Sequence, residues 1–95
     1  MKHNVYFDGK VQSLSLNTAE GNATIGVITP GKYAFSTSTV ERMVITSGTL
    51  NVKLPNEDWK LYINNQEFIV QANVTFEVEA SQDVSYICYY DSQSR

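Results

Sequence analysis

The sequence predicts an all-β fold in which about nine or ten short strands form one small domain. Nearly every segment alternates between apolar and polar residues with a period of two, which is the pattern of strands that bury one face. Turn signals such as Asp8-Gly9 and Pro30-Gly31 separate these segments at close intervals. No window carries the i, i+3, i+4, i+7 stripe of an amphipathic helix, so we expect the strands to build a barrel or a sandwich.

Each expected strand is justified by its own residues. The first places Val11, Leu14 and Leu16 mostly on one side, the second is rich in β-branched residues, and the third alternates Tyr33 and Phe35 with small residues. The later segments alternate in the same way. The expected strands are "VQSLSL" (11–16), "ATIGVIT" (23–29), "KYAFST" (32–37), "ERMVIT" (41–46), "TLNVKL" (49–54), "WKLYI" (59–63), "EFIV" (67–70), "TFEVEA" (75–80) and "VSYICYY" (84–90).

The hairpin around Ser47-Gly48 contains the most informative carboxylate. Gly48 can adopt the positive φ that a tight hairpin requires. On the strand before it, Glu41, Met43 and Ile45 share one face. If that face points inward, Glu41 is a charged residue in an apolar wall. An unpaired carboxylate there would be costly, so we expect it to contact a partner, a water or a ligand.

The composition is that of a globular chain with an acidic balance. Its 95 residues suit a single domain spanning 1–95, with a core at about 5–90 and a frayed tail at 91–95. The formal net charge of −3 argues against nonspecific binding to nucleic acid, which needs a cationic surface. No apolar run approaches the length of about 18 residues that a membrane helix needs, and the N-terminus lacks the apolar region of a signal peptide. We therefore expect a cytoplasmic protein that binds neither nucleic acid nor membrane.

One cysteine and one histidine exclude several chemistries. Cys88 is the single cysteine and cannot form an internal disulfide. Cys88 and His3 together are also too few ligands for a zinc cluster. A nucleophilic Cys/His pair is not expected either, because His3 lies near the N-terminus. We interpret Cys88 as a buried packing residue.

Five stretches in the right order and spacing resemble one known family. They are "VYFDGKVQS", "ATIGVITPGKYAFST", "ERMVITSGTLNVKLP", "DWKLYINNQEFIV" and "YICYY". Together they resemble the pyrimidine/purine nucleoside phosphorylases, which are very small single-domain cupins, and the likeness runs from Val5 to Tyr90. It implies a cupin-like β-barrel of the jelly-roll type. It also implies phosphate-dependent cleavage of purine and pyrimidine nucleosides to free base and ribose 1-phosphate, with inorganic phosphate as co-substrate and no metal or other cofactor.

The sequence departs from the general cupin pattern at several positions. Thr37 and Thr39 stand where a metal-binding cupin has His-x-His, which agrees with the absence of a metal in the implied chemistry. Glu41 follows these two threonines, and it comes two or three residues earlier than the glutamate of the general cupin pattern. Asn65 replaces the glycine of a later hairpin and can adopt the left-handed conformation there. Gln71 replaces the usual turn proline, which we expect to affect only the rim of the pocket.

The resemblance assigns candidate roles to several residues. Glu41 is the candidate catalytic residue, because a carboxylate accepts bonds from ribose hydroxyls and stabilises an oxocarbenium-like transition state. If its strand extends from Thr37, then Thr37, Thr39 and Glu41 share one face. Thr37, Thr39 and Ser36 are candidate hydroxyl donors to phosphate, and Lys10 is a candidate cation. The alternatives are an ion pair at the barrel mouth for Glu41 and ordinary surface positions for the others.

Aromatic residues supply candidates for contact with the base. Tyr33 and Tyr86 could stack on it, although core packing explains such residues equally well. Arg42 has the opposite parity to Glu41 and should point away from the pocket.

Three classes of function remain open from composition and periodicity alone. They are a metal-free nucleoside phosphorylase, a non-catalytic cupin that binds a sugar or nucleotide, and an interaction protein. The family resemblance favours the enzyme. Because the sheet edges of so small a barrel need covering, we expect a homodimer that pairs or packs edge strands.

Overall fold

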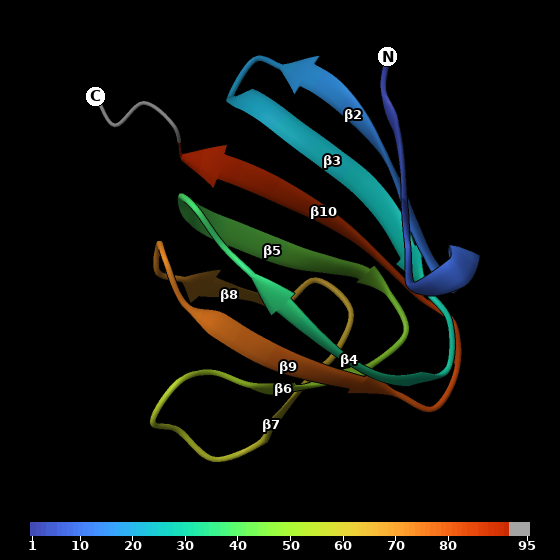
Figure 1. Ribbon diagram of the computed structural model, residues 1–95, viewed down its shortest axis with the longest axis vertical. Coiled ribbons are helices and arrows are strands. Elements are labelled where there is room, and N and C mark those ends of the chain that lie inside the picture. Colours follow the sequence, from blue (N-terminus) through green and yellow to red (C-terminus); the bar gives the residue numbers. More distant parts are fainter. Residues whose placement is uncertain (92–95) are drawn as a thin grey trace.

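The computed structural model describes residues 1–91, with side chains through Tyr90, and its regular structure is formed by strands and one short 3₁₀ turn, Phe7–Gly9 (Figure 1). Ten strands are present over these residues, which confirms the prediction of an all-β chain. Of the tail predicted to fray, residues 92–95 lie outside the described part. The strands are β1 (His3–Tyr6), β2 (Val11–Thr18), β3 (Gly21–Ile28), β4 (Gly31–Ser36), β5 (Val40–Ser47), β6 (Leu50–Lys53), β7 (Lys60–Tyr62), β8 (Glu67–Val70), β9 (Thr75–Ala80) and β10 (Val84–Asp91).

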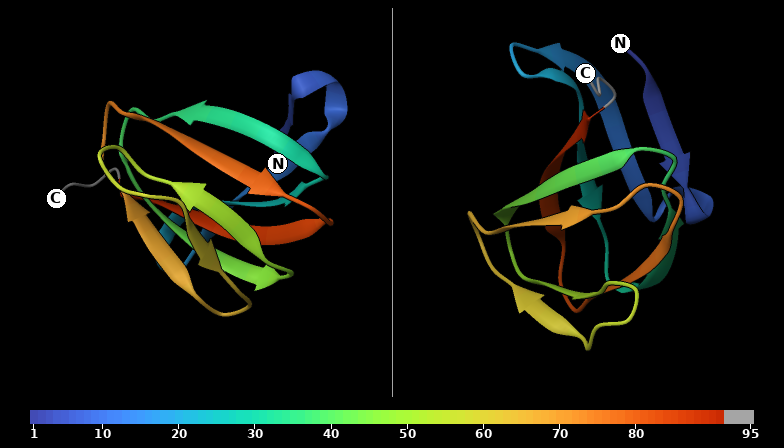
Figure 2. Two further views of the ribbon diagram at one scale, coloured as in Figure 1. Left: turned by 90° about the horizontal axis from the view of Figure 1, so that it is seen from below. Right: turned by 90° about the vertical axis from the view of Figure 1, so that its left-hand side faces the viewer.

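The strands form two antiparallel sheets. One has six strands in the order β1-β2-β3-β10-β5-β8, and the other has four in the order β4-β9-β6-β7. Figures 1 and 2 show the first three strands together on one side of the molecule and β6 and β7 on the opposite side. Over residues 1–91 the hydrogen bonding does not join the two sheets into one closed barrel, so the jelly-roll takes the form of two facing sheets.

The core lies between the inward faces of the two sheets. Val11, Ile45 and Leu50 are completely buried, and the alternation of each strand brings their neighbours inward as well. Phe68 contacts both Tyr62 and Phe76 at one side of this core, with ring centroids 4.9 and 6.3 Å apart. The apolar faces predicted for residues 41–46 and 49–54 are therefore part of one continuous core.

The β5–β6 connection is a turn between the two sheets rather than the expected hairpin, because β5 pairs with β10 and β8 whereas β6 pairs with β9 and β7. The positive backbone angles are nevertheless as expected, since Gly48 has a φ of 92° and Asn65, in the β7–β8 connection, has a φ of 69°. Gly48 N–H donates to the Asn64 side-chain oxygen at 3.1 Å, which links the two turns. Arg42 leaves the core as predicted, because its guanidinium donates to Glu20 at 2.7 Å and to Glu67 at 3.2 Å.

The connection between β4 and β5 differs from the expectation. The predicted strand face shared by Thr37, Thr39 and Glu41 is not formed, because β4 ends at Ser36 and β5 begins at Val40. The intervening residues bend, and the two strands join different sheets. Among residues 1–91 the structure holds no helix whose length and apolarity would let it cross a membrane.

Candidate functional site

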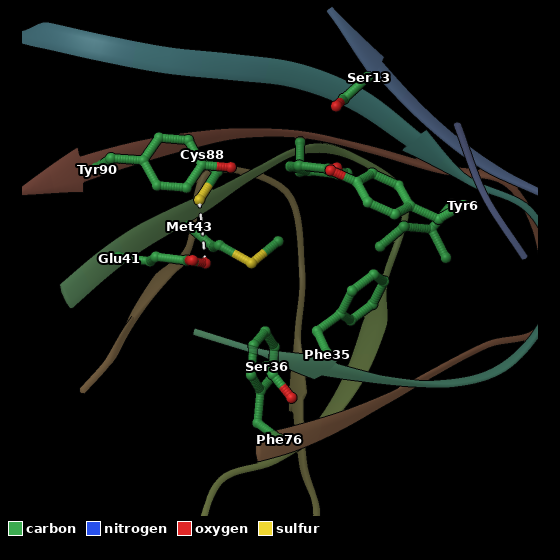
Figure 3. Close-up of a pocket in the computed structure, with 11 residues that line it drawn as sticks. Tyr6, Ser13, Phe35, Ser36, Glu41, Met43, Phe76, Cys88 and Tyr90 are labelled. Carbon is green, nitrogen blue, oxygen red and sulfur yellow. Dashed lines mark hydrogen bonds between the residues drawn. The ribbon is translucent and has the colours of Figure 1, made fainter. Parts of the chain in front are cut away.

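A cavity of about 120 Å³ opens between the two sheets (Figure 3). Its lining combines aromatic rings with hydroxyl groups, one carboxyl group and one thiol, contributed by both sheets. A mixed lining of this kind suits a flat ligand that also carries hydroxyl groups. The lining residues are Tyr6, Ser13, Ile28, Phe35, Ser36, Glu41, Met43, Phe76, Tyr86, Cys88 and Tyr90.

Glu41 enters this cavity from β5. It shares the inward face of that strand with Met43 and Ile45, which are both buried, so the alternation of the sequence directs the carboxyl group inward. Burial raises the pKa of Glu41 above its usual value of 4.5, because a charged carboxylate loses solvation there. The carboxyl group is nevertheless accessible from the cavity, where it can meet a ligand.

The Cys88 thiol is the protein partner of this carboxyl group. Its Sγ donates to Glu41 Oε1 at 3.5 Å, and this bond partly offsets the rise in the Glu41 pKa. Burial, and next the nearby Glu41 charge, raise the pKa of Cys88 well above its usual range. The thiol therefore keeps its proton at neutral pH and acts as a hydrogen-bond donor rather than as a nucleophile.

Tyr90 lies beside this pair at the end of β10. It stands opposite Glu41 in the β5–β10 register, and its hydroxyl group lies 3.1 Å from the hydroxyl of Thr24 on β3. Its ring lies on the same face of β10 as Cys88, and both residues line the cavity. Burial raises the pKa of Tyr90 far above its usual value, so the phenol stays neutral. Thr24, Tyr90, Cys88 and Glu41 thus form a chain of side chains from β3 to β5.

Tyr86 lines the same cavity two strand positions before Cys88. Its ring lies over Gly26 of β3, where a Cβ atom would approach the Tyr86 Oη to 2.5 Å. Burial is the main cause that raises the pKa of Tyr86 to about 12, whereas the nearby Ser13 hydroxyl acts in the opposite direction. The Tyr86 hydroxyl is therefore a neutral group at physiological pH.

Aromatic rings form the wall contributed by β4 and β9. Phe35 and Phe76 face each other with ring centroids 5.8 Å apart and planes tilted by 34°. Tyr6 of β1 meets the edge of Phe35 at 6.4 Å. Ser36 lies beside them, and its hydroxyl group is 3.1 Å from that of Thr75. Figure 3 shows these rings on the opposite side of the cavity from Cys88 and Tyr90, so a flat ligand would lie between them.

The structure brings three of the predicted site residues together at the cavity, namely Glu41, Ser36 and Tyr86. It places Tyr33 in the core, where the phenol donates to the Thr29 carbonyl at 3.0 Å and to the Pro30 carbonyl at 3.1 Å. Tyr33 is therefore held by the β3–β4 turn rather than presented to a ligand.

Thr37, Thr39 and Lys10 are likewise not among the described residues that line the cavity. The Thr37 hydroxyl donates to the Gln71 carbonyl at 2.7 Å, and it accepts from the Val74 N–H at 3.2 Å, so it fastens the turn after β8. Thr39 lies in the bend before β5. Lys10 is exposed and follows the 3₁₀ turn. These placements follow from the break in the strand at Ser36 and from the turn before β2.

Several residues of the site were not predicted from the sequence, among them Tyr6, Ser13, Cys88 as a partner of Glu41, and Tyr90. A signal for two of them existed, since Cys88 and Tyr90 share their strand parity with Tyr86. Their proximity to Glu41 depends on the pairing of β10 with β5, which are far apart in the sequence and whose register local patterns do not reveal.

A ligand set for a metal ion is not assembled in the described residues. Within residues 1–90 no group of three His, Cys, Asp or Glu side chains is close enough to hold an ion. His3 lies on the exposed surface, where its ring nitrogen is 2.8 Å from the Gln12 side chain. Metal independence remains a prediction that a chelator can test.

Comparisons with known proteins bear on both the fold and the site. Residues 1–90 match the model of a family described as "Pyrimidine/purine nucleoside phosphorylase". A protein with this name from Pseudomonas syringae pv. tomato is 47% identical over 90 residues, which cover 94% of this chain and 97% of the relative. The family match includes Glu41 and all the other residues that line the cavity.

Two solved structures are also similar. A protein of unknown function from Vibrio parahaemolyticus has 39% identity and a TM-score of 0.88, and the match covers 92% of this chain and 94% of that one. A cupin domain of a transcriptional regulator from Enterobacter cloacae has 14% identity and a TM-score of 0.69, over 83% of this chain and 93% of that one. The second likeness concerns the fold alone and confirms the prediction of a cupin-like β fold.

Proposed function

This chain belongs to the pyrimidine/purine nucleoside phosphorylase family, and from that premise we propose that it is a pentosyltransferase that cleaves nucleosides with inorganic phosphate. A phosphate oxygen attacks the anomeric carbon of the ribose, and the bond between that carbon and the base breaks. The electron pair of this bond leaves with the base, which takes up a proton. The products are ribose 1-phosphate and a free purine or pyrimidine. The observation that carries the proposal is the family match over residues 1–90.

We assign to Glu41 the role of binding the ribose and stabilising its positive charge in the transition state. As the bond to the base breaks, positive charge develops on the ring oxygen and the anomeric carbon. A carboxylate in a partly buried site stabilises that charge more strongly than it would in water. The Cys88 bond occupies one oxygen, Oε1, so Oε2 is available to ribose hydroxyl groups.

We assign the base to the aromatic wall. Phe35 and Phe76 offer ring faces and edges to a flat heterocycle, and Met43 adds an adaptable apolar contact. Aromatic contacts have little preference for a particular base edge. This property supports acceptance of both purine and pyrimidine nucleosides, because the aromatic wall discriminates only weakly between bases of different ring size or hydrogen-bonding pattern. Ser36 is placed to bond a hydroxyl or phosphate oxygen at the edge of this wall.

The proposed reaction uses no cofactor, and phosphate enters only as co-substrate. We also expect the enzyme to work in the cytoplasm, where a buried free thiol such as Cys88 stays reduced. We further expect it to bind neither nucleic acid nor membrane. The protein is expected to act as a homodimer, in which the outer face of the six-stranded sheet is the candidate contact surface.

The experiment that tests the function measures free base released from uridine and from inosine, with and without phosphate. Release that depends on phosphate and yields ribose 1-phosphate supports the enzyme. Release that persists without phosphate would indicate hydrolysis instead. Absence of release from several nucleosides at high protein concentration would exclude the phosphorylase. The same assay after treatment with a chelator tests metal independence, since activity lost to the chelator and restored by a metal ion would contradict it.

A further inference from the structure

A second arrangement of polar groups in the cavity, separate from the Glu41–Cys88 pair, is built by three cross-strand neighbours. Ser13 of β2 stands opposite Gly26 of β3, and Gly26 stands opposite Tyr86 of β10. All three residues are buried. Directly paired residues of an antiparallel sheet point to the same face, so the side chains of Ser13 and Tyr86 both reach the cavity above Gly26.

Gly26 allows the phenol of Tyr86 to lie across β3. A Cβ atom at position 26 would stand 2.5 Å from the Tyr86 Oη and 2.6 Å from its Cζ. Tyr86 therefore fills the space that a side chain at position 26 would otherwise occupy. Its hydroxyl group extends beyond its own strand toward Ser13, two strands away.

A hydrogen bond from Asn4 orients one hydroxyl group of this arrangement. Asn4 Nδ2 donates to Ser13 Oγ at 3.2 Å, so the Ser13 proton is available to a further acceptor. Ser13 and Tyr86 line the same part of the cavity, and Ser13 acts to lower the phenol's pKa, whereas burial keeps the phenol protonated. A protonated phenol has one O–H that can donate to an acceptor. The Tyr86 hydroxyl is therefore a neutral donor at the cavity wall.

Figure 3 shows that Ser13 and Tyr6 lie at one end of the cavity, whereas Glu41 lies nearer Tyr90. Tyr86 pairs with Ile45, and Glu41 is four residues earlier on β5, about 13 Å along the backbone, although the Glu41 charge still contributes to the raised pKa of Tyr86. One end of the cavity therefore presents hydroxyl donors and the other presents a carboxylate. An anion is repelled less at the donor end, because the repulsion falls with distance from the carboxylate.

We propose that the hydroxyl group of Tyr86 binds the phosphate co-substrate, and that Ser13 and Gly26 are positioning residues that hold this hydroxyl group. The Tyr6 phenol is the second donor at the same end. This inference rests on the function proposed above and names the part of the site that phosphate occupies. The ribose then lies between the two ends, with its anomeric carbon toward phosphate and its hydroxyl groups toward Glu41.

The test compares Tyr86→Phe with Tyr62→Phe. The first variant removes only the oxygen in the cavity, and the second removes a phenol oxygen from a ring packed on Phe68 in the core. We expect Tyr86→Phe to raise the KM for phosphate about tenfold or more, which is the usual effect of losing a hydrogen bond to a charged group. The KM for uridine should change by less than about twofold. Both constants should stay unchanged in Tyr62→Phe.

Binding of inorganic phosphate, measured by calorimetry without nucleoside, gives a readout that does not need turnover. We expect its Kd to rise by the same factor in Tyr86→Phe. Gly26→Ala should also raise the KM and the Kd for phosphate, because the Tyr86 phenol must leave its place. Circular dichroism verifies that this variant is folded. A phosphate KM and Kd within about twofold of the original in Tyr86→Phe would overturn the inference. A rise in the KM for uridine that equals or exceeds the rise in the KM for phosphate would also overturn it.

The failure of the inference differs from the failure of the proposed function. If the unmodified protein releases no base, the phosphorylase is excluded, and the calorimetric comparison alone decides the role of Tyr86. Phosphate binding that weakens in Tyr86→Phe then supports the anion site. The anion site is excluded if the unmodified protein and Tyr86→Phe bind phosphate equally, or if the unmodified protein does not bind phosphate at millimolar concentration.

Discussion

Glu41 illustrates, at the scale of a single residue, how a site residue can act against the stability of the fold. Burial raises its pKa above 4.5, so the folded protein favours the protonated carboxyl group. Its contribution to stability is therefore complete at pH values below the unfolded pKa. This contribution is lost as the pH rises through the higher folded pKa. Ionisation of Glu41, which the proposed reaction requires, therefore costs the folded protein stability relative to a neutral side chain at this position.

Glu41→Gln should consequently lower activity and raise stability. We expect kcat for phosphorolysis to fall about 100-fold, the usual scale for removing one electrostatic stabiliser of a transition state. Glu79→Gln, which neutralises an exposed carboxylate on β9, is the matched control and should leave kcat unchanged. Unchanged kinetics in Glu41→Gln would remove Glu41 from the catalytic site.

Thermal unfolding measured against pH tests the other half of this prediction. At pH 7 Glu41→Gln should melt at a higher temperature than the unmodified protein. The two melting temperatures should converge as the pH falls below about 4.5, where the carboxyl group is protonated in both states. A variant that is less stable at pH 7 would show that the carboxylate is compensated by partners in the folded protein.

Cys88 gives a second prediction at the residue scale, since its thiol donates to Glu41. That bond stabilises the carboxylate and lowers its pKa, so its removal in Cys88→Ala should raise the pKa further. The acidic limb of the profile of kcat/KM against pH, where activity falls as Glu41 is protonated, should shift to higher pH. Cys88→Ser keeps a donor and should shift the limb little. An identical acidic limb in all three proteins would contradict this role of Cys88.

The same residues show what the sequence could and could not predict about the site. Alternation along residues 41–46 placed Glu41 inward, because side-chain direction in a strand depends only on parity. Cys88 was interpreted as a packing residue, since nothing local to position 88 indicates that β10 pairs with β5. Tyr86 was a candidate for base stacking. Its place above Gly26 depends on the register of a third strand.

At the scale of elements, strand alternation and turn residues predicted most of the fold, whereas the expected continuous strand from Thr37 to Glu41 and the expected β5–β6 hairpin were wrong. An alternating segment does not reveal where one sheet ends and the next begins. Thr37 lies just past the end of β4, where both its hydroxyl and its backbone bond to the turn after β8, at Gln71, Asn73 and Val74. These contacts join segments that are far apart in the sequence, so local alternation does not reveal them. The hydroxyl groups expected beside Glu41 are therefore supplied by other elements, β1, β2 and β10.

The turn between β5 and β6 supplies a testable prediction about an element of the fold. Gly48 has a φ of 92°, and a Cβ atom there would lie 2.9 Å from the Asp83 carbonyl oxygen. Gly48→Ala should therefore destabilise the protein by about 2 kcal/mol, from the left-handed backbone alone. Thr49→Ala, at the exposed neighbouring position, is the control and should have little effect. Urea unfolding measures both, and an unchanged midpoint in Gly48→Ala would show that the turn adapts without cost.

At the scale of the whole molecule, the two faces of the six-stranded sheet have different chemistry. The inward face supplies Glu41, Tyr86 and Cys88 to the cavity. The outward face carries an apolar row, one residue from each of β2, β3, β10 and β5, which stand opposite one another in register. This outer apolar row consists of Leu14, Ile25, Ile87 and Val44.

The outer apolar row is the surface on which the expected homodimer can be tested. Leu14 and Ile25 are 45% and 49% exposed, and exposed apolar side chains that adjoin across several strands favour association with another protein surface. A second copy of the chain offers the same row, and a two-fold axis would bring the two rows together.

Ile25→Asp should therefore yield a monomer in sedimentation velocity at micromolar concentration, where the unmodified protein is expected to be a dimer. Placing a carboxylate in a desolvated contact is costly, whereas the same change on an exposed monomer surface costs little. Leu61→Asp is the matched control, because Leu61 is 53% exposed on β7 of the other sheet. It should remain dimeric. A monomeric unmodified protein would contradict the dimer, and a dimeric Ile25→Asp would place the contact elsewhere, for instance on the sheet edges at β1, β8, β4 or β7.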